Sequence, residues 1–297
     1  MKHLSNTTGR SLIHFFKTEK VQAGLKKMLR NVLAPFLVPI VKIAKRRAKN
    51  NVCIFHNGRC GSTVIAHLLG KHGKIHWDGE IYSKYFLKPD GKTFGKVNYE
   101  RDQSIRILKN KMKAIFTKYY GFDVKRNHIE WFNFSISDYI EQLKELGFDR
   151  FIVLERQNHL RTILSYTIAR EMGIWHIHRH EAAVEKTLRI NPEKVYLAYE
   201  EMDLLNALEL MSCYYRDLRN ALKDLNVPYL DVTYEKDIRE NPMVAYKKII
   251  EYLGLRPKQP KIRFNRTNPF PLSKMVSNYD ELDKYLSKTP YAWMLEG

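Results

Sequence analysis

A glycine-bearing turn between an apolar strand and an apolar helix carries the residues best suited to chemistry. Residues 52–55 are apolar, Gly58 and Gly61 follow, and an apolar helix is expected over residues 62–69. Such a turn aims backbone N–H groups and the positive end of the helix dipole at whatever lies in front of it. Arg59 adds a full charge, and Ser62 and Thr63 add hydroxyl donors. The pattern predicts a phosphate loop over residues 59–63; the alternative is a structural turn that binds nothing.

The turn differs from the loop of ordinary nucleoside triphosphate enzymes, which follows the pattern GxxxxGK[ST]. Gly58 and Gly61 stand closer together than that pattern requires, and no lysine follows Gly61. The spacing therefore disfavours an ATPase or a GTPase.

The segment Arg59-Cys60-Gly61-Ser62-Thr63 resembles a known loop. It is similar to the 5′-phosphosulfate loop of sulfotransferases that use 3′-phosphoadenosine 5′-phosphosulfate (PAPS), in the style of bacterial and Golgi-type carbohydrate or lipid enzymes. In that family a Lys or Arg precedes Ser-Gly-Ser/Thr-Ser/Thr, so Cys60 stands where Ser is common. Either Cys60 fills a tight turn, or the helix end and the neighbouring arginine lower its pKa and make it oxidisable.

The resemblance implies a second phosphate site, in which an arginine at a strand end and a serine on the next helix bind the 3′-phosphate. Arg156 ends an apolar strand that covers residues 151–154, and Ser165 follows on the next helix. The interval between them is one residue longer than is common in the family. The turn must therefore absorb one residue, or Arg161 shares the role of Arg156.

The resemblance also implies a catalytic base near Glu80, which follows an expected strand over residues 74–77. Burial beside Trp77 and Tyr82 is expected to raise the pKa of Glu80 toward the working pH, as a general base requires. The competing bases are histidines, namely His56, His76 and His128.

The elements that position these residues alternate between short apolar strands and longer helices. Asp138, with Glu141 three residues later, is expected to cap a helix that stops at Gly147. Further strands are expected within residues 114–124 and over 229–233, and further helices over 159–171, 204–225 and 242–253. This order predicts one α/β domain over residues 51–297, a parallel sheet with helices on both faces. The basic stretch 258–266 and the residues up to 274 are expected to fold over the cofactor, to form the acceptor mouth, or to form a flexible solvated tail.

The charge of the chain is concentrated at its N-terminus. The formal net charge is +19, and residues 1–50 hold 12 Lys and Arg against Glu19 alone. Residues 11–31 have the pattern of a basic amphipathic helix, so residues 11–49 are expected either to bind an anionic membrane surface or to pack on the domain. No signal peptide is recognised, and the apolar run 32–41 is shorter than the roughly 20 residues of a membrane span. We expect a cytoplasmic protein, peripheral at the inner face of the membrane.

The expected activity is sulfuryl transfer from PAPS to an acceptor hydroxyl, with adenosine 3′,5′-bisphosphate as the other product. A carbohydrate or lipid acceptor is favoured over a protein, Glu80 is the expected base, and Arg59 stabilises charge on the leaving oxygen. The three cysteines, Cys53, Cys60 and Cys213, form no zinc-binding spacing, and no metal is expected. Two alternatives stay open: a non-catalytic basic protein that binds nucleic acid or membrane, and a metal-dependent small-molecule kinase. No nucleic-acid motif is present, so nucleic acid is not the expected partner.

Overall fold

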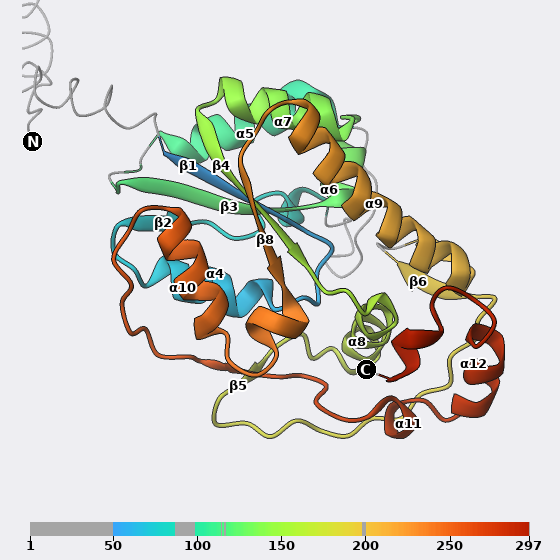
Figure 1. The fold of residues 1–297 in the computed structure, drawn as a ribbon. Helices are drawn as coiled ribbons and strands as arrows, with labels where there is room; N and C mark the ends of the chain where they lie inside the picture. Colours follow the sequence, from blue (N-terminus) through green and yellow to red (C-terminus); the bar gives the residue numbers. More distant parts are fainter. Residues whose placement is uncertain (1–49, 87–98, 114, 116, 198–199, 297) are drawn as a thin grey trace, which may run out of the picture. The chain divides into compact units, whose positions relative to one another are not determined.

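A five-stranded, all-parallel sheet forms the centre of the protein (Figure 1). The structure is a computed structural model that describes residues 50–86, 99–113, 115, 117–197 and 200–296. The strand order is β2-β3-β1-β4-β8, and Ile54 at the centre pairs with Asp123 on one side and Ile152 on the other. The strands are β1 Asn51–His56, β2 Ile75–Trp77, β3 Tyr119–Lys125, β4 Phe148–Glu155 and β8 Tyr229–Thr233. The predicted parallel α/β fold is confirmed.

Helices cover both faces of this sheet because successive side chains of a strand point to opposite sides. Val52 and Ile54 pack in one apolar cluster with the helices α4 (Ser62–Gly70) and α10 (Met243–Tyr252). Cys53 and Phe55 pack in another cluster on the opposite face. Its helices are α5 Arg101–Met112, α7 Ile136–Glu145 and α9 Leu204–Asp224. Figure 1 shows the two layers on either side of the strands.

A third apolar cluster joins the C-terminal part of the chain to α8, which spans His159–Met172. Leu164 of α8 and Leu208 of α9 lie in this cluster together with Leu282 and Met294 near the C-terminus. The remaining elements are short: η3 Ser83–Phe86, α6 Arg126–Trp131, β5 Ile177–His178, β6 Val195–Leu197, β7 Glu200–Met202, the π-helix η4 Tyr234–Ile238, β9 Phe264–Asn265, α11 Leu272–Met275, α12 Tyr279–Leu286 and η5 Ala292–Glu296.

The expected cap of α7 is wrong by one turn. Ser135, in an extended backbone conformation, is the N-cap, and its Oγ accepts a hydrogen bond from the Asp138 N–H at 3.1 Å. Asp138 lies in the first turn, where its charge favours the positive helix end. Gly147, at φ +85°, follows the end of the helix as expected.

The basic arm over residues 1–49 and the division of the chain at residue 50 lie outside the described residues, and both stay predictions. Within the part that the structure describes, every helix is too short or too polar to cross a membrane. The same part contains no group of three or more His, Cys, Asp or Glu side chains that is arranged to hold a metal ion.

Candidate functional site

All five strands of the sheet end at the same edge, and each is followed there by a residue of the candidate site. Open parallel sheets bind ligands at the carboxyl ends of their strands, because the loops that leave those ends converge. The residues that follow the strand ends are Arg59 after β1, Glu80 after β2, Lys125 at the end of β3, Arg156 after β4 and Tyr234 after β8.

The phosphate loop has a backbone that favours glycine. Gly58 and Gly61 both have φ +84°, and Arg59 between them has φ +52°. A Cβ on Gly61 would lie 2.8 Å from Ile238 Cγ2, which is too close for a normal contact. Both the positive φ and this steric clash therefore disfavour any residue other than glycine at position 61. Gly61 is also the N-cap of α4 and has no side chain to accept the first N–H groups of the helix. N–H groups without a side-chain cap, together with the helix dipole, are suited to an anion.

The two predicted phosphate sites are in direct contact. Arg59 Nε donates a hydrogen bond to Ser165 Oγ at 3.0 Å, and Arg156 Nη1 donates to the backbone oxygen of Arg59 at 3.3 Å. Arg59 is held further by the Trp175 carbonyl and the Thr267 hydroxyl, each at 2.9 Å. Residues that are 106 and 97 positions apart in the chain therefore meet at one place.

These residues line a cavity of about 560 Å³, which we call the donor cavity. Its lining includes five arginines and two glutamates. Burial, and then the nearby charge of Arg156, lowers the pKa of Arg59 to about 10. Arg156 lies over the Tyr234 ring at 4.6 Å, and its Nε is buried with no hydrogen-bond partner among the described residues. Positive charge that is buried and incompletely paired suits a multiply charged anion.

Arg161, the alternative to Arg156, lies elsewhere. Its Nη1 donates to the Phe270 carbonyl at 2.6 Å and contacts the Met275 sulfur at 3.4 Å. It is not part of the lining of the donor cavity, whereas Arg156 and Ser165 both are.

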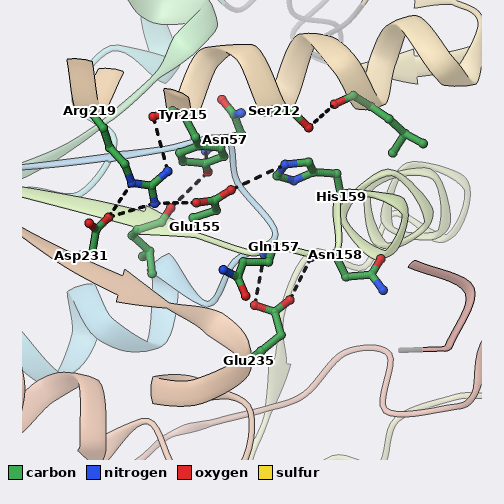
Figure 2. A network of polar contacts seen from close by, with 12 residues as sticks. Asn57, Glu155, Gln157, Asn158, His159, Ser212, Tyr215, Arg219, Asp231 and Glu235 are labelled. Atoms are coloured by element: carbon green, nitrogen blue, oxygen red, sulfur yellow. Dashed lines mark hydrogen bonds and ion pairs between the residues drawn. The ribbon is translucent and has the colours of Figure 1, made fainter. Parts of the chain in front are cut away.

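The turn that carries Arg156 is held by a carboxylate from the next strand end (Figure 2). Glu235 accepts hydrogen bonds from the Gln157 and Asn158 N–H groups, both at 3.1 Å. Asn158 caps α8, since its Oδ1 accepts from the Arg161 N–H at 2.9 Å. These contacts hold the turn that follows Arg156 at the start of α8.

The same network connects the ends of β1 and β4, as Figure 2 shows. The Tyr215 hydroxyl accepts from the Asn57 N–H and donates to the Leu154 carbonyl, both at 3.1 Å. Beside it, Arg219 bridges Glu155 at 2.6 Å and Asp231 at 2.9 Å. The hydroxyl thus bridges the end of β1 and the end of β4, two strands that also pair directly in the sheet.

A second cavity, of about 330 Å³, adjoins the first, and we call it the acceptor cavity. The two cavities share five lining residues: Arg59, Ser62, Thr63, Trp175 and His176. Glu80 and Lys125 line only the acceptor cavity of the two. A group bound at the phosphate loop would therefore be accessible from both cavities.

A comparison with protein families gives a match for part of the chain. Residues 135–270, a little under half of the chain, match the family model described as Stf0 sulphotransferase. This stretch is therefore similar to a sulfotransferase domain. No curated protein matches the chain. The matched stretch includes Arg156 and Ser165, whereas the phosphate loop precedes it.

Glu80 has a lowered pKa, contrary to the expectation of a raised one. Burial alone would raise the pKa, but Lys125 Nζ lies 2.7 Å from Glu80 Oε2 and outweighs it, with smaller contributions from His56 and His128. The pKa of Glu80 therefore lies well below its usual range. The expectation was wrong because it depended on Trp77 and Tyr82, which are near Glu80 in the sequence. Lys125, which is 45 positions away in the sequence, is the charge that lowers the pKa of Glu80 most.

Cys60 is fully buried in the apolar cluster beneath α4 and does not line either cavity. Burial raises the pKa of its thiol to about 12. The interpretation of a reactive, low-pKa cysteine is therefore wrong, and the side chain fills a tight turn instead.

The three candidate histidines lie outside the lining of both cavities. Burial lowers the pKa of His56 to about 4 and that of His128 to about 3. His56 Nδ1 accepts from the Gly58 N–H at 2.8 Å, which supports the phosphate loop, and His76 pairs with Asp78 at 3.1 Å. His176, which was not considered, lines both cavities.

Sequence reasoning also missed Lys125, Trp175, Tyr234 and Thr267. Lys125 and Tyr234 stand at the ends of strands β3 and β8, so their position was a usable signal. Trp175 and Thr267 lie in irregular segments and had no such signal. The stretch 264–269 lines the donor cavity, and β9 within it pairs with β5, so this part of the chain is not a solvated tail.

Proposed function

We propose that the chain transfers a sulfuryl group from PAPS to an acceptor hydroxyl, with a carbohydrate or a lipid as acceptor. A sulfotransferase domain supports sulfuryl transfer in general. The observation that carries the finer proposal is the contact between Arg59 and Ser165 inside one arginine-rich cavity. PAPS has two separate phosphate-containing groups, and this cavity joins two separate sites for them.

The residues of the donor cavity fit PAPS. Backbone N–H groups of the phosphate loop would hold the 5′-phosphosulfate, with Arg59, Ser62 and Thr63 as side-chain donors; Cys60 and Gly61 would contribute backbone alone. Arg156 and Ser165 would hold the 3′-phosphate. The unpartnered Nε of Arg156 and the glycine-only position Gly61 support this fit. When bound, PAPS supplies an electrophilic sulfur and a stable leaving group.

The residues of the acceptor cavity complete the reaction. The acceptor oxygen forms a bond to sulfur, in line, as the bond from sulfur to the bridging oxygen breaks. The bridging oxygen keeps that electron pair and leaves as part of adenosine 3′,5′-bisphosphate, while the acceptor proton passes to the carboxylate of Glu80. Arg59 and the loop N–H groups stabilise the charge on the leaving oxygen. Because a sulfuryl group carries less charge than a terminal phosphoryl group, the proposal requires no metal.

The test compares adenosine 3′,5′-bisphosphate with AMP and with RNA as ligands, by melting temperature and calorimetry. We expect the bisphosphate to stabilise the protein most, and Arg156→Ala to remove most of its advantage over AMP. A charge-assisted hydrogen bond is worth about 1.5 to 3 kcal/mol, or about tenfold or more in affinity. Arg189→Ala, an exposed arginine paired with Glu281, is the matched control and leaves the advantage intact.

Two outcomes would replace this proposal. Stronger binding of RNA would favour a non-catalytic nucleic-acid protein, and magnesium-dependent phosphoryl transfer from ATP would favour a kinase. If the preference for the bisphosphate survives Arg156→Ala, the assignment of the 3′-phosphate site fails, and Arg161→Ala is the next variant.

The cytoplasmic, membrane-peripheral location also belongs to this proposal. It depends on the basic arm over residues 11–49, which lies outside the described residues. Its support is the charge of the arm, and its test follows in the Discussion.

A further inference from the structure

One ammonium group lies between the carboxylate of the acceptor cavity and the phosphate loop. Lys125 Nζ is 2.7 Å from Glu80 Oε2, and Ser83 Oγ donates to the same oxygen at 2.7 Å. The ion pair is partly exposed, with side-chain exposures of 23% for Lys125 and 30% for Glu80. Its two members can therefore separate without a charge being left in an apolar core.

Lys125 is also next to the loop itself. A Cβ on Gly58 would lie 3.6 Å from Lys125 Cε and 4.0 Å from Nζ. The ammonium lines the same cavity as Arg59, Ser62 and Thr63. A lysine carries a compact charge on a flexible stem, so rotation of its last bonds moves that charge between Glu80 and the loop.

The charged and titratable groups around Glu80 leave Lys125 as its main partner. Asp123 is buried beside them on β3. Burial first, and then Glu80, raises its pKa to about 8, which makes it a weaker competitor than Glu80 for Lys125. The other groups that act on Glu80 or are acted on by it are His56 on β1, His128 on α6, Arg59 and Cys60 in the phosphate loop, and His176 after α8.

This pairing conflicts with the role of Glu80 in the proposed function. A carboxylate held by a nearby cation is a weak proton acceptor, because proton transfer follows the basicity of the base. Glu80 becomes an effective base only when Lys125 has another anion to pair with. The sulfuryl end of the donor, bound at the phosphate loop, is such an anion.

We propose that Lys125 exchanges partners during the reaction, from Glu80 to the oxygens of the bound sulfuryl group. The exchange couples donor binding to the release of Glu80 for proton abstraction, so the base is active only when the sulfuryl group is in place. It also places a second cation, beside Arg59 and the helix dipole of α4, where negative charge is transferred. This inference depends on the proposed function and adds a residue to it.

The test needs no known acceptor, because it compares PAPS with adenosine 3′,5′-bisphosphate, which lacks the sulfuryl group. Calorimetry on Lys125→Met should show PAPS affinity reduced by about tenfold or more relative to the bisphosphate. Lys125→Arg should keep most of the preference, since it keeps the charge. Lys111→Met is the matched control, because Lys111 pairs with Asp78 at 3.7 Å and lines neither cavity.

A variant on the other side of the pair changes affinity in the opposite direction. Glu80→Gln should bind PAPS about twofold to fivefold more tightly than the wild type, since Lys125 no longer has to leave an ion pair of modest strength. Carbon-13 NMR of labelled glutamate carboxyl groups gives a second measure. The depressed pKa of Glu80 should rise in Lys125→Met, and it should also rise in the wild type when PAPS binds.

The outcomes separate the two proposals. If neither PAPS nor the bisphosphate binds the wild type, the proposed function fails. If both bind but Lys125→Met keeps the preference for PAPS, or Glu80→Gln weakens it, the partner exchange is wrong and the proposed function stands.

Discussion

Two junctions of the sheet, β1 to α4 and β4 to α8, both lead from a parallel strand into a helix. They differ in how the first N–H groups of the helix are capped. At the junction of β1 and α4, the N-cap is Gly61, which has no side chain. At the junction of β4 and α8, the N-cap is Asn158, which accepts from the Arg161 N–H, and Glu235 accepts the N–H groups of Gln157 and Asn158. The first helix end is left for a ligand, whereas the second is satisfied by the protein itself.

A helix N-terminus can act as an anion site where the protein leaves its first N–H groups without a side-chain cap. The uncapped end of α4 offers its backbone to an anion. The capped end of α8 instead holds a rigid turn that presents two side chains, Arg156 and Ser165, to the donor cavity. The proposed backbone site and the proposed side-chain site thus lie on neighbouring strands.

The largest effect is expected from Gly61→Ala, which tests the uncapped junction. The left-handed backbone costs a non-glycine residue about 1 to 2 kcal/mol, and the added Cβ would clash with Ile238 at 2.8 Å. We expect the affinity for adenosine 3′,5′-bisphosphate to fall by more than about tenfold, together with a lower melting temperature. Gly254→Ala is the control, with φ +61° and no atom within 4 Å of the new Cβ, and it should lower stability without lowering affinity. If Gly61→Ala binds adenosine 3′,5′-bisphosphate as tightly as the wild type does, the backbone at the start of α4 is not a phosphate site.

An intermediate effect is expected from Glu235→Gln, which tests the capped junction. The amide keeps one acceptor oxygen and places an N–H₂ group against a backbone N–H, so the turn loosens. Unfolding by urea should become easier by about 1 to 2 kcal/mol, and the preference for the bisphosphate over AMP should fall by about threefold. AMP affinity itself should hold, because AMP would contact only the phosphate loop. Glu251→Gln, at an exposed position of α10, is the control. If Glu235→Gln weakens AMP and bisphosphate binding equally, the two junctions do not bind separate phosphate groups.

The smallest effect on either junction is expected from deletion of residues 1–48. Every proposed phosphate ligand lies beyond the cut in the sequence, so the affinity for the bisphosphate should change by less than about twofold. The same deletion should abolish co-sedimentation with anionic vesicles, and added salt should weaken that binding in the intact chain, since surface charges are screened over about 8 Å at physiological ionic strength. If vesicle binding is unchanged both by the deletion and by added salt, the arm is not the membrane anchor. Loss of folding on deletion would favour an arm that packs on the domain.

The sequence by itself determined the order of strands and helices and the junctions at which the site lies. The apolar run of β1, the glycines around Arg59, and Arg156 at the end of β4 are all local features. Local features are sufficient here because strand and helix patterns, and glycine conformations, depend on near neighbours in the chain. In a parallel sheet such junctions converge at the carboxyl edge, so the predicted fold class is consistent with where these residues lie.

Only the tertiary structure decided how the side chains at that edge act on one another. Cys60 and Arg161 turned out to face away from the cavity, and Glu80 turned out to be paired with Lys125. Trp175 and Thr267 reached Arg59 from segments far along the chain. The physical reason is that burial and short-range charge interactions set pKa values and hydrogen bonds, and both depend on strand register and on contacts between residues far apart in sequence.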